Sequence, residues 1–204
     1  MDRRTTIKWV LAASAAWPLL EARTVAAAQP PIPGYGTDPS LTRDYRPGEL
    51  WPLTFTPRQR RLVAALADII IPADPHSAAA SAVGVVDFLD EWVSAPYPQS
   101  RRDRPLVLEG LAWLDAESSR RFGREFAALA AAQQLLICDD ICAPARAAAA
   151  HQGAARFFAR FRDLTSGAFY STDAGRKDLG YIGNVPLTRF DGPPAALLAK
   201  LNLS

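Results

Sequence analysis

Apolar residues recur at the three- and four-residue spacing of an amphipathic α-helix in five separate stretches of the chain. The spacing predicts helices over 57–71, 83–93, 105–122, 125–141 and 151–170, and a short last helix over 193–201. The side chains expected to face the interior are Leu62, Val63, Leu66, Ile69, Ile70, Val85, Phe88, Leu89, Trp92, Leu106 or Val107, Leu111, Leu114, Phe126, Leu129, Leu136, Ile137, Phe157, Phe158, Phe161, Leu164 and Phe169. No stretch alternates apolar and polar residues for long enough to indicate a strand. We therefore predict an all-α fold, a single small helical domain of about five helices.

Local signals mark where two of these helices begin. Thr56 followed by Pro57 is typical of a helix start, because the threonine side chain accepts a backbone N–H and proline has none to leave unpaired. The third helix is expected to begin near Pro105, with Asp103 or Arg104 as its cap.

Two long irregular arms flank the helices. Residues 29–55 are rich in proline and glycine, which sustain neither a helix nor a central strand, so we expect an extended arm. Residues 171–194 also lack a regular pattern, which is unusual for a stretch of that length in a compact domain. Either both arms pack back on their own helices, or they lie on another protein and place anchors in its pockets. Those anchors would be Trp51, Tyr181, Ile182 and Phe190.

The N-terminus carries the three parts of an export signal. A charged start with the adjacent arginines Arg3 and Arg4 precedes an apolar run over 9–20 and a small-residue stretch that ends at Ala28. The run is shorter than the ~20 residues that a membrane-spanning helix needs, although a membrane-anchoring helix is the alternative. We interpret residues 1–28 as a twin-arginine signal peptide. That route exports proteins that fold or load a cofactor first, which suggests a cofactor in a partner.

The charge balance argues against a nucleic-acid partner. The 204 residues include 23 Lys and Arg against 21 Asp and Glu, a net charge of +2, and the hydrophobic fraction of 49% is ample for a buried core. Arginine clusters in two places near helix starts: Arg58, Arg60 and Arg61, and Arg101, Arg102 and Arg104. We interpret both clusters as solvated helix faces.

Patterns that carry chemistry are scarce. His76 and His151 are far apart, and neither has a second histidine at metal-ligand spacing. The sequence has neither the Cys-x-x-Cys-His of c-type haem attachment nor a glycine-rich dinucleotide fingerprint before a helix. We therefore expect no catalytic residue, cofactor site or metal site in this chain.

The nearest approach to a carboxylate site is a group of four aspartates: Asp68, Asp74, Asp87 and Asp90. We favour a structural interpretation, in which Asp74 caps or turns the chain. Asp87 and Asp90 would then lie with Glu91 on the solvent face of the second helix.

Two cysteines, Cys138 and Cys142, lie four residues apart in Cys-Asp-Asp-Ile-Cys. In an exported protein such a pair suggests a disulfide. Residues four apart on a regular helix have β-carbons about 5–6 Å apart, whereas a disulfide needs ~3.5–4.5 Å. A bridge therefore requires the helix to unwind before Pro144. Two free thiols, or one thiol bonded to a partner, are the alternatives.

Three parts of the chain, taken in order, form a recognisable pattern. The first is Leu-Ala-Asp-Ile-Ile-Ile-Pro-Ala-Asp at 66–74 with Gly-Val-Val-Asp-Phe-Leu-Asp at 84–90. The second is 157–170, which closes in Leu-Thr-Ser-Gly-Ala-Phe-Tyr, and the third is Leu-Gly-Tyr-Ile-Gly-Asn-Val-Pro at 179–186. Together with the twin-arginine signal they resemble the gluconate 2-dehydrogenase subunit 3 family. The resemblance covers most of the mature chain, but the two-cysteine segment and the alanine-rich 143–155 depart from the family pattern.

The resemblance implies a non-catalytic small subunit of a membrane-associated dehydrogenase that acts on gluconate, glucose, fructose or a related polyol. FAD would lie in a large catalytic partner subunit, and haem in a cytochrome c subunit that often accompanies it. The small subunit would carry the export signal and support folding of the flavoprotein. Its place would be the periplasm, at the outer face of the inner membrane, with only indirect membrane association, and residues 56–204 would be its subunit 3-like domain.

Two other functions remain open at this point. One is an independent periplasmic enzyme that uses Asp68, Asp74 and His76. The other is a stand-alone periplasmic interaction or binding domain. A neighbouring gene for a large FAD-binding oxidoreductase would favour the accessory subunit over both.

Overall fold

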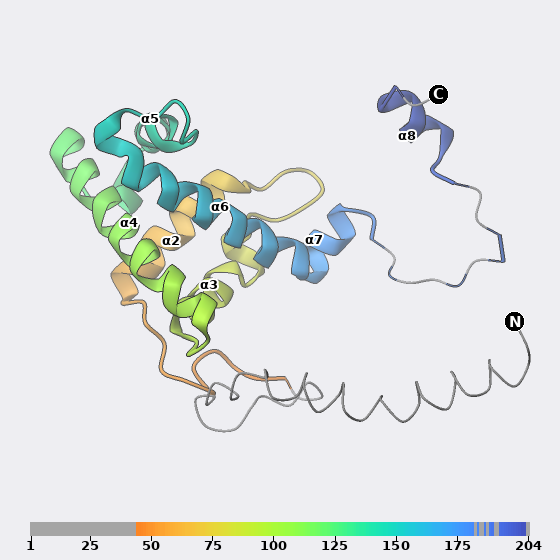
Figure 1. Cartoon of the computed structure of the whole chain (residues 1–204), viewed down its shortest axis with the longest axis horizontal. Coiled ribbons are helices and arrows are strands. Elements are labelled where there is room, and N and C mark those ends of the chain that lie inside the picture. Colours follow the sequence, from red (N-terminus) through yellow and green to blue (C-terminus); the bar gives the residue numbers. More distant parts are fainter. Residues whose placement is uncertain (1–43, 182, 184–185, 187, 190–191, 203–204) are drawn as a thin grey trace, which may run out of the picture. The chain divides into compact units, whose positions relative to one another are not determined.

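The structure is a computed structural model that describes residues 44–181, 183, 186, 188–189 and 192–202. Of these residues 67% are helical and none lies in a strand, which confirms the predicted all-α fold. Five long helices are present, as the periodicity predicts, together with two short ones (Figure 1). The α-helices are α2 (Pro57–Ile70), α3 (Val85–Ser94), α4 (Pro98–Phe122), α5 (Ala131–Ile141), α6 (Gln152–Ser171), α7 (Asp173–Asp178) and α8 (Ala195–Lys200), and the 3-10 turns are η1 (Ala80–Val83), η2 (Phe126–Ala128) and η3 (Ala149–His151).

Helix α2 begins where the sequence predicts, at a reciprocal cap between Thr56 and Gln59. The Gln59 N–H donates to Thr56 Oγ1 at 3.2 Å, and the Thr56 N–H donates to Gln59 Oε1 at 2.9 Å. Pro57 occupies the first helical position, where its missing N–H leaves nothing unpaired. This start fixes the direction in which the preceding arm enters the helical domain.

Phenylalanines of α6 form the centre of the core. Phe157, Phe161 and Phe169 are fully shielded from solvent, and the rings of Phe157 and Phe161 lie 5.6 Å apart between centroids. Helices α2, α3, α4 and α5 all contact α6 (Figure 1), and the fully buried residues that they supply include Leu66, Leu89, Leu114 and Ile137. Burying a side chain of this size contributes about 1.5–3 kcal/mol, so the contacts of α6 with these four helices contribute much of the stability of the core.

Helix α3 begins later than predicted because a glycine separates it from a preceding turn. Ala80–Val83 form the 3-10 turn η1, and Gly84 after it has φ 87°. That left-handed conformation strains a residue with a β-carbon. The predicted start at Val83 is therefore wrong, and α3 starts at Val85.

Helix α4 is longer than predicted and contains a proline. It begins at Pro98, so the expected start at Pro105, with Asp103 or Arg104 as its cap, is wrong. The Arg104 guanidinium donates to carbonyls at the end of α3, including that of Ser94 at 2.8 Å. These tertiary bonds hold the first turns of α4, and the helix continues through Pro105 although proline has no N–H to donate.

The fourth predicted helix is interrupted. The backbone is extended at Leu129 and Ala130, between the turn η2 and the start of α5 at Ala131. The interruption changes which residues face inward, because the helical period restarts after it. Leu136, predicted to be buried, is 56% exposed, while Ile137 is fully buried.

A short helix, α7, follows α6 within the stretch that was predicted to be irregular. Thr172 caps it, and its Oγ1 accepts the Gly175 N–H at 3.1 Å. Gly175 lies so close to the end of α6 that a β-carbon there would be 2.2 Å from the Phe169 carbonyl oxygen. Periodicity cannot reveal a helix of six residues, and this turn depends on the glycine.

Candidate partner-binding site

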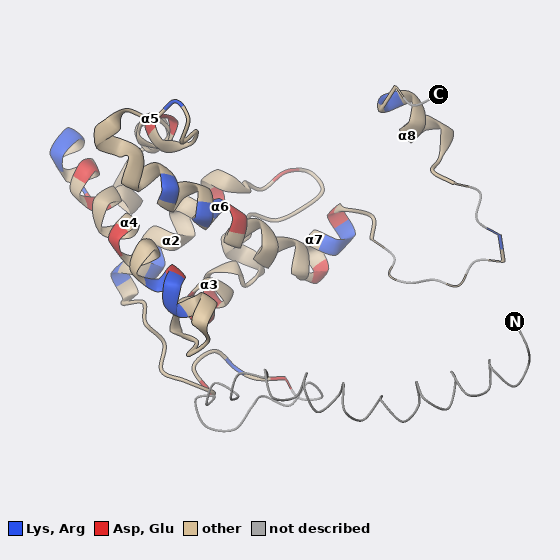
Figure 2. Ribbon diagram, viewed as in Figure 1, with Lys and Arg blue, Asp and Glu red and all other residues tan. Residues whose placement is uncertain are grey.

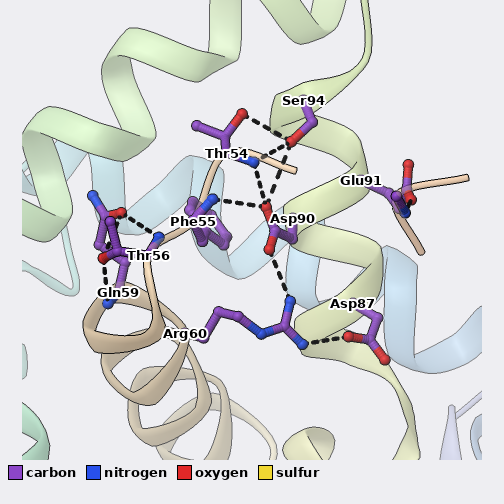
Figure 3. A network of polar contacts seen from close by, with 10 residues as sticks. Thr54, Phe55, Thr56, Gln59, Arg60, Asp87, Asp90, Glu91 and Ser94 are labelled. Atoms are coloured by element: carbon purple, nitrogen blue, oxygen red, sulfur yellow. Dashed lines mark hydrogen bonds and ion pairs between the residues drawn. The ribbon is translucent and has the colours of Figure 1, made fainter. Parts of the chain in front are cut away.

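Asp90 is a fully buried carboxylate that joins three elements. Its Oδ1 accepts the backbone N–H groups of Thr54 at 3.0 Å and Phe55 at 2.9 Å, and its Oδ2 accepts from Arg60 at 2.8 Å (Figure 3). The same guanidinium also pairs with Asp87. The predicted exposure of Asp90 is therefore wrong, because the arm before α2 covers it. A buried charge is tolerated when it is paired and hydrogen-bonded on all sides.

The network ties residues 44–55 of the N-terminal arm to α3. Besides the bonds to Asp90, the Ser94 hydroxyl accepts the Thr54 N–H at 2.8 Å, and the Glu91 carboxylate accepts the Gly48 N–H at 2.5 Å. Of the two arrangements predicted for the arm, this part adopts the one in which it packs on its own helices.

Trp92 of α3 is held by a second polar network on its inner side. Its indole N–H donates to Asp103 at 2.8 Å, and Arg160 of α6 forks onto the same carboxylate at 3.0 and 2.6 Å. Burial raises the pKa of Asp103, but the hydrogen bonds from Arg160 and Trp92 outweigh it and lower that pKa below its usual value. The Arg160 guanidinium also lies 5.8 Å from the centre of the Trp92 ring. These contacts hold the indole ring of Trp92 in one position.

The arm, α3 and the start of α4 enclose a hollow of about 390 Å³ with aromatic walls, which we call the aromatic hollow. Phe88 stacks on Trp92 with 6.0 Å between ring centroids, and Trp51 meets Tyr97 edge to face at 5.8 Å. Its remaining lining residues are Glu91, Ala95, Gln99 and Ser100. Phe88 is 38% exposed and Tyr97 41%. Large aromatic surface is thus held open to solvent.

Trp51 has an unsatisfied polar atom. Its indole nitrogen is shut off from solvent and finds no acceptor within the described part of the chain. A buried donor without a partner costs about 1–3 kcal/mol. The side chain as a whole is only partly buried.

Of the other anchors predicted from the sequence, the structure describes Tyr181 alone. Tyr181 follows α7 and is 60% exposed, and its backbone N–H donates to the Arg176 carbonyl at 2.9 Å. Ile182 and Phe190 lie outside the described residues, as do the export-signal residues Arg3 and Arg4. Their predicted roles therefore stay predictions.

Sequence reasoning missed two walls of the aromatic hollow, Phe88 and Tyr97. Phe88 was assigned to the buried face of its helix, but it lies at the edge of that face and is half-exposed. Tyr97 lies between Pro96 and Pro98, and it is the residue with extended backbone that precedes α4. An aromatic residue between two prolines was the available signal, since such a segment is held extended.

The aspartates considered for a carboxylate site serve the fold. Asp68 accepts the Ser81 N–H at 2.8 Å and the Ser81 hydroxyl at 2.7 Å, which joins α2 to η1. Asp74 accepts the N–H groups of His76 at 2.7 Å and Ser77 at 2.8 Å, and these bonds lower the pKa of Asp74. Asp74 turns the chain as predicted. The described residues contain no group of three or more His, Cys, Asp or Glu arranged to hold a metal ion.

Both cysteines, Cys138 in α5 and Cys142 directly after it, are free thiols in this structure. Cys138 is 3% exposed, and burial raises the pKa of its thiol to about 12. Cys142 is partly exposed at the end of the helix, and its thiol donates to the Asp139 carbonyl at 3.5 Å. A bridge between the cysteines, or from one of them to a partner, stays a prediction.

Charges of both signs are interspersed over the described helices, as Figure 2 shows. Arg58 pairs with Asp115 at 2.9 Å and Arg121 with Asp140 at 2.7 Å, so the charges of these two arginines are neutralised locally. Among the described helices none combines the length and the apolar character required to cross a bilayer.

Comparison with known proteins gives one match. The model of a family described as Gluconate 2-dehydrogenase subunit 3 matches residues 57–189. No curated protein and no solved structure matches the chain. The matched stretch begins at the first residue of α2 and includes Phe88, Trp92 and Tyr97, whereas Trp51 precedes it.

Proposed function

Because the chain belongs to the gluconate 2-dehydrogenase subunit 3 family, we propose that it is the non-catalytic small subunit of an FAD-dependent sugar or polyol dehydrogenase. The partner is the large FAD-binding subunit, which carries out the oxidation of gluconate, glucose, fructose or a related polyol. A cytochrome c subunit with bound haem is the expected electron acceptor. The family membership is the observation that carries this proposal.

The use that the chain makes of its polar residues supports an accessory role. Asp68, Asp74 and Asp90, the carboxylates that could have formed a catalytic group, accept hydrogen bonds that hold loops and the arm in place. Large aromatic side chains, in contrast, are left accessible in the aromatic hollow. Accessible aromatic surface on a rigid support suits protein recognition.

The N-terminal signal gives the proposed subunit its second task. Arg3 and Arg4 would direct the chain to the twin-arginine route, which accepts folded cargo. A flavoprotein that has loaded FAD in the cytoplasm would cross the membrane bound to this chain. The complex would then work in the periplasm, at the outer face of the inner membrane, without a membrane segment in the described helices.

Co-expression of the chain with a large FAD-binding dehydrogenase subunit from the same source tests the proposal. We expect the two to co-purify, with flavin absorbance and sugar-dependent dye reduction in the complex. The isolated chain is expected to show neither. Flavin bound to the isolated chain, or failure of the two proteins to associate, would contradict the proposed function.

A further inference from the structure

We infer that the aromatic hollow is where the FAD-binding subunit docks, and that it receives an apolar side chain of that subunit next to a lysine or arginine. The inference rests on the proposed function, which supplies the partner. It goes further by assigning the contact to four aromatic residues, Trp51, Phe88, Trp92 and Tyr97, and by stating the chemistry of the group that they receive.

The shape and rigidity of the hollow favour an inserted apolar group. A volume of about 390 Å³ is ample for one large side chain and the backbone beside it. Trp92 is fixed by Asp103 and Arg160 on its inner side, and the arm behind Trp51 is fixed by Asp90. A partner therefore meets walls that are already ordered, so little conformational entropy is lost on docking.

The charge at the rim favours a cation beside the apolar group. Asp87 and Asp90 on the same helix share Arg60. Glu91 lines the hollow, and within the described residues it accepts the Gly48 N–H but has no cationic partner. A lysine or arginine of the partner would form an ion pair with the Glu91 carboxylate, whereas a carboxylate of the partner would be repelled by it.

The chain contains a matched control surface. Leu135 and Leu136 on α5 are 48% and 56% exposed, at least as much as Phe88 and Tyr97, but they do not line the aromatic hollow. Singly exposed leucines are ordinary on protein surfaces. They allow a specific loss at the aromatic hollow to be separated from a general loss of exposed apolar area.

The test measures the affinity of the chain for the purified FAD-binding subunit by isothermal titration calorimetry. Phe88→Ala with Tyr97→Ala should weaken binding at least about 10-fold, the effect expected of central aromatic anchors, while Leu135→Ala with Leu136→Ala should change it less than about 2-fold. Glu91→Lys should also weaken binding, and more at low salt than at high salt, because it turns an attraction into a repulsion. Circular dichroism of each variant verifies that helicity is kept. The salt dependence of binding by the Glu91→Lys chain remains informative if the aromatic double variant unfolds.

Each other outcome decides against the inference in a distinguishable way. The inference is overturned if the affinity is unchanged in both the Phe88→Ala, Tyr97→Ala chain and the Glu91→Lys chain. If only the Leu135→Ala, Leu136→Ala chain loses affinity, the interface lies on α5. A loss confined to Tyr181→Ala moves it to the segment after α7. If sedimentation shows a dimer that the Phe88→Ala, Tyr97→Ala chain cannot form, the hollow receives a second copy of this chain. If the unmodified chain does not bind the FAD-binding subunit at all, the proposed function itself fails.

Discussion

Gly110 of α4 lies directly against the ring of Phe157 in α6. A β-carbon built on Gly110 would lie 1.9 Å from Cγ of that ring, far inside van der Waals contact. The absent side chain allows the two helices to approach closely around the most buried part of the core. Gly110→Ala should therefore destabilise the chain by on the order of 1–3 kcal/mol, as overpacking does, measured as the free energy of unfolding in urea.

Gly167 of α6 provides the control for this prediction. A β-carbon there meets nothing within 4 Å. Gly167→Ala should be neutral or stabilise the helix by about 0.5–1 kcal/mol, because alanine restricts the unfolded chain. Equal effects of the two substitutions would show that the α4–α6 contact is not as close as described.

The buried pair of Asp90 and Arg60 should dominate the attachment of the arm. Asp90→Ala leaves the N–H group of Phe55 without an acceptor, the N–H group of Thr54 with the Ser94 hydroxyl alone, and Arg60 with Asp87 alone. We expect a loss of about 3–5 kcal/mol in the free energy of unfolding, together with faster proteolysis within 44–55. Asp87→Ala, which removes a half-exposed partner of the same arginine, should cost about 1 kcal/mol or less. A mild Asp90→Ala variant with a protected arm would contradict this assignment.

The sequence contained most of the fold because the core is made of long amphipathic helices. The buried phenylalanines of α6 and the start of α2 at Thr56 were predicted correctly. Errors arose where tertiary contacts override local signals. Arg104 holds the start of α4 across a proline, and the arm covers Asp90.

The candidate site was predictable only in part. The sequence names Trp51 as an interface anchor for the case in which the arms lie on another protein. The residue lines the aromatic hollow, and its contact with a partner stays a prediction. Phe88 looked like a core residue, since helical spacing alone does not distinguish the centre of an apolar face from its edge. The juxtaposition of Trp51 with Tyr97 joins the arm to the start of α4, and no sequence pattern reports such a pairing.

Glu117 should make the stability of the chain depend on acid pH. Its side chain is 8% exposed and accepts hydrogen bonds from Arg120 and Arg121. The pKa of Glu117 is lowered from 4.5 to about 2, chiefly by the hydrogen bond from Arg120. Burial opposes this shift, and the hydrogen bond from Arg121 adds to it. Between these two values the unfolded chain binds a proton that the folded chain does not, so stability falls as the pH falls through this window.

The size of this effect is up to about 3 kcal/mol, reduced by the exposure of Arg120 to solvent. Urea unfolding at a series of pH values measures it. Glu117→Gln should flatten the slope of stability between pH 4.5 and 2. Glu109→Gln, on the exposed side of the same helix, is the matched control substitution.

The thiols of Cys138 in α5 and Cys142 at its end should differ sharply in reactivity. A thiol-specific reagent such as dithionitrobenzoate attacks the thiolate, and Cys138 is buried with its pKa raised to about 12. In the folded chain we expect one equivalent of fast reaction, at Cys142, and a second only after unfolding. Cys142→Ser should abolish the fast phase and Cys138→Ser should keep it. If exported, unreduced protein shows no reactive thiol even after unfolding, and its mass is lower by two hydrogens, the two cysteines form the disulfide instead.

Export of the complex should depend on the arginine pair at the N-terminus. Arg3→Lys with Arg4→Lys keeps the charge of the signal but removes the guanidinium groups that the twin-arginine route requires. Both this chain and the FAD-binding subunit should then accumulate in the cytoplasm, the latter with its flavin, as followed by immunoblotting and flavin absorbance of the cell fractions. Arg23→Lys makes the same chemical change within the signal but outside the pair, and it should leave export intact. If the FAD-binding subunit reaches the periplasm while this chain stays behind, it has an export signal of its own. The role of this chain would then be limited to assembly, and the arginine pair would serve this chain alone.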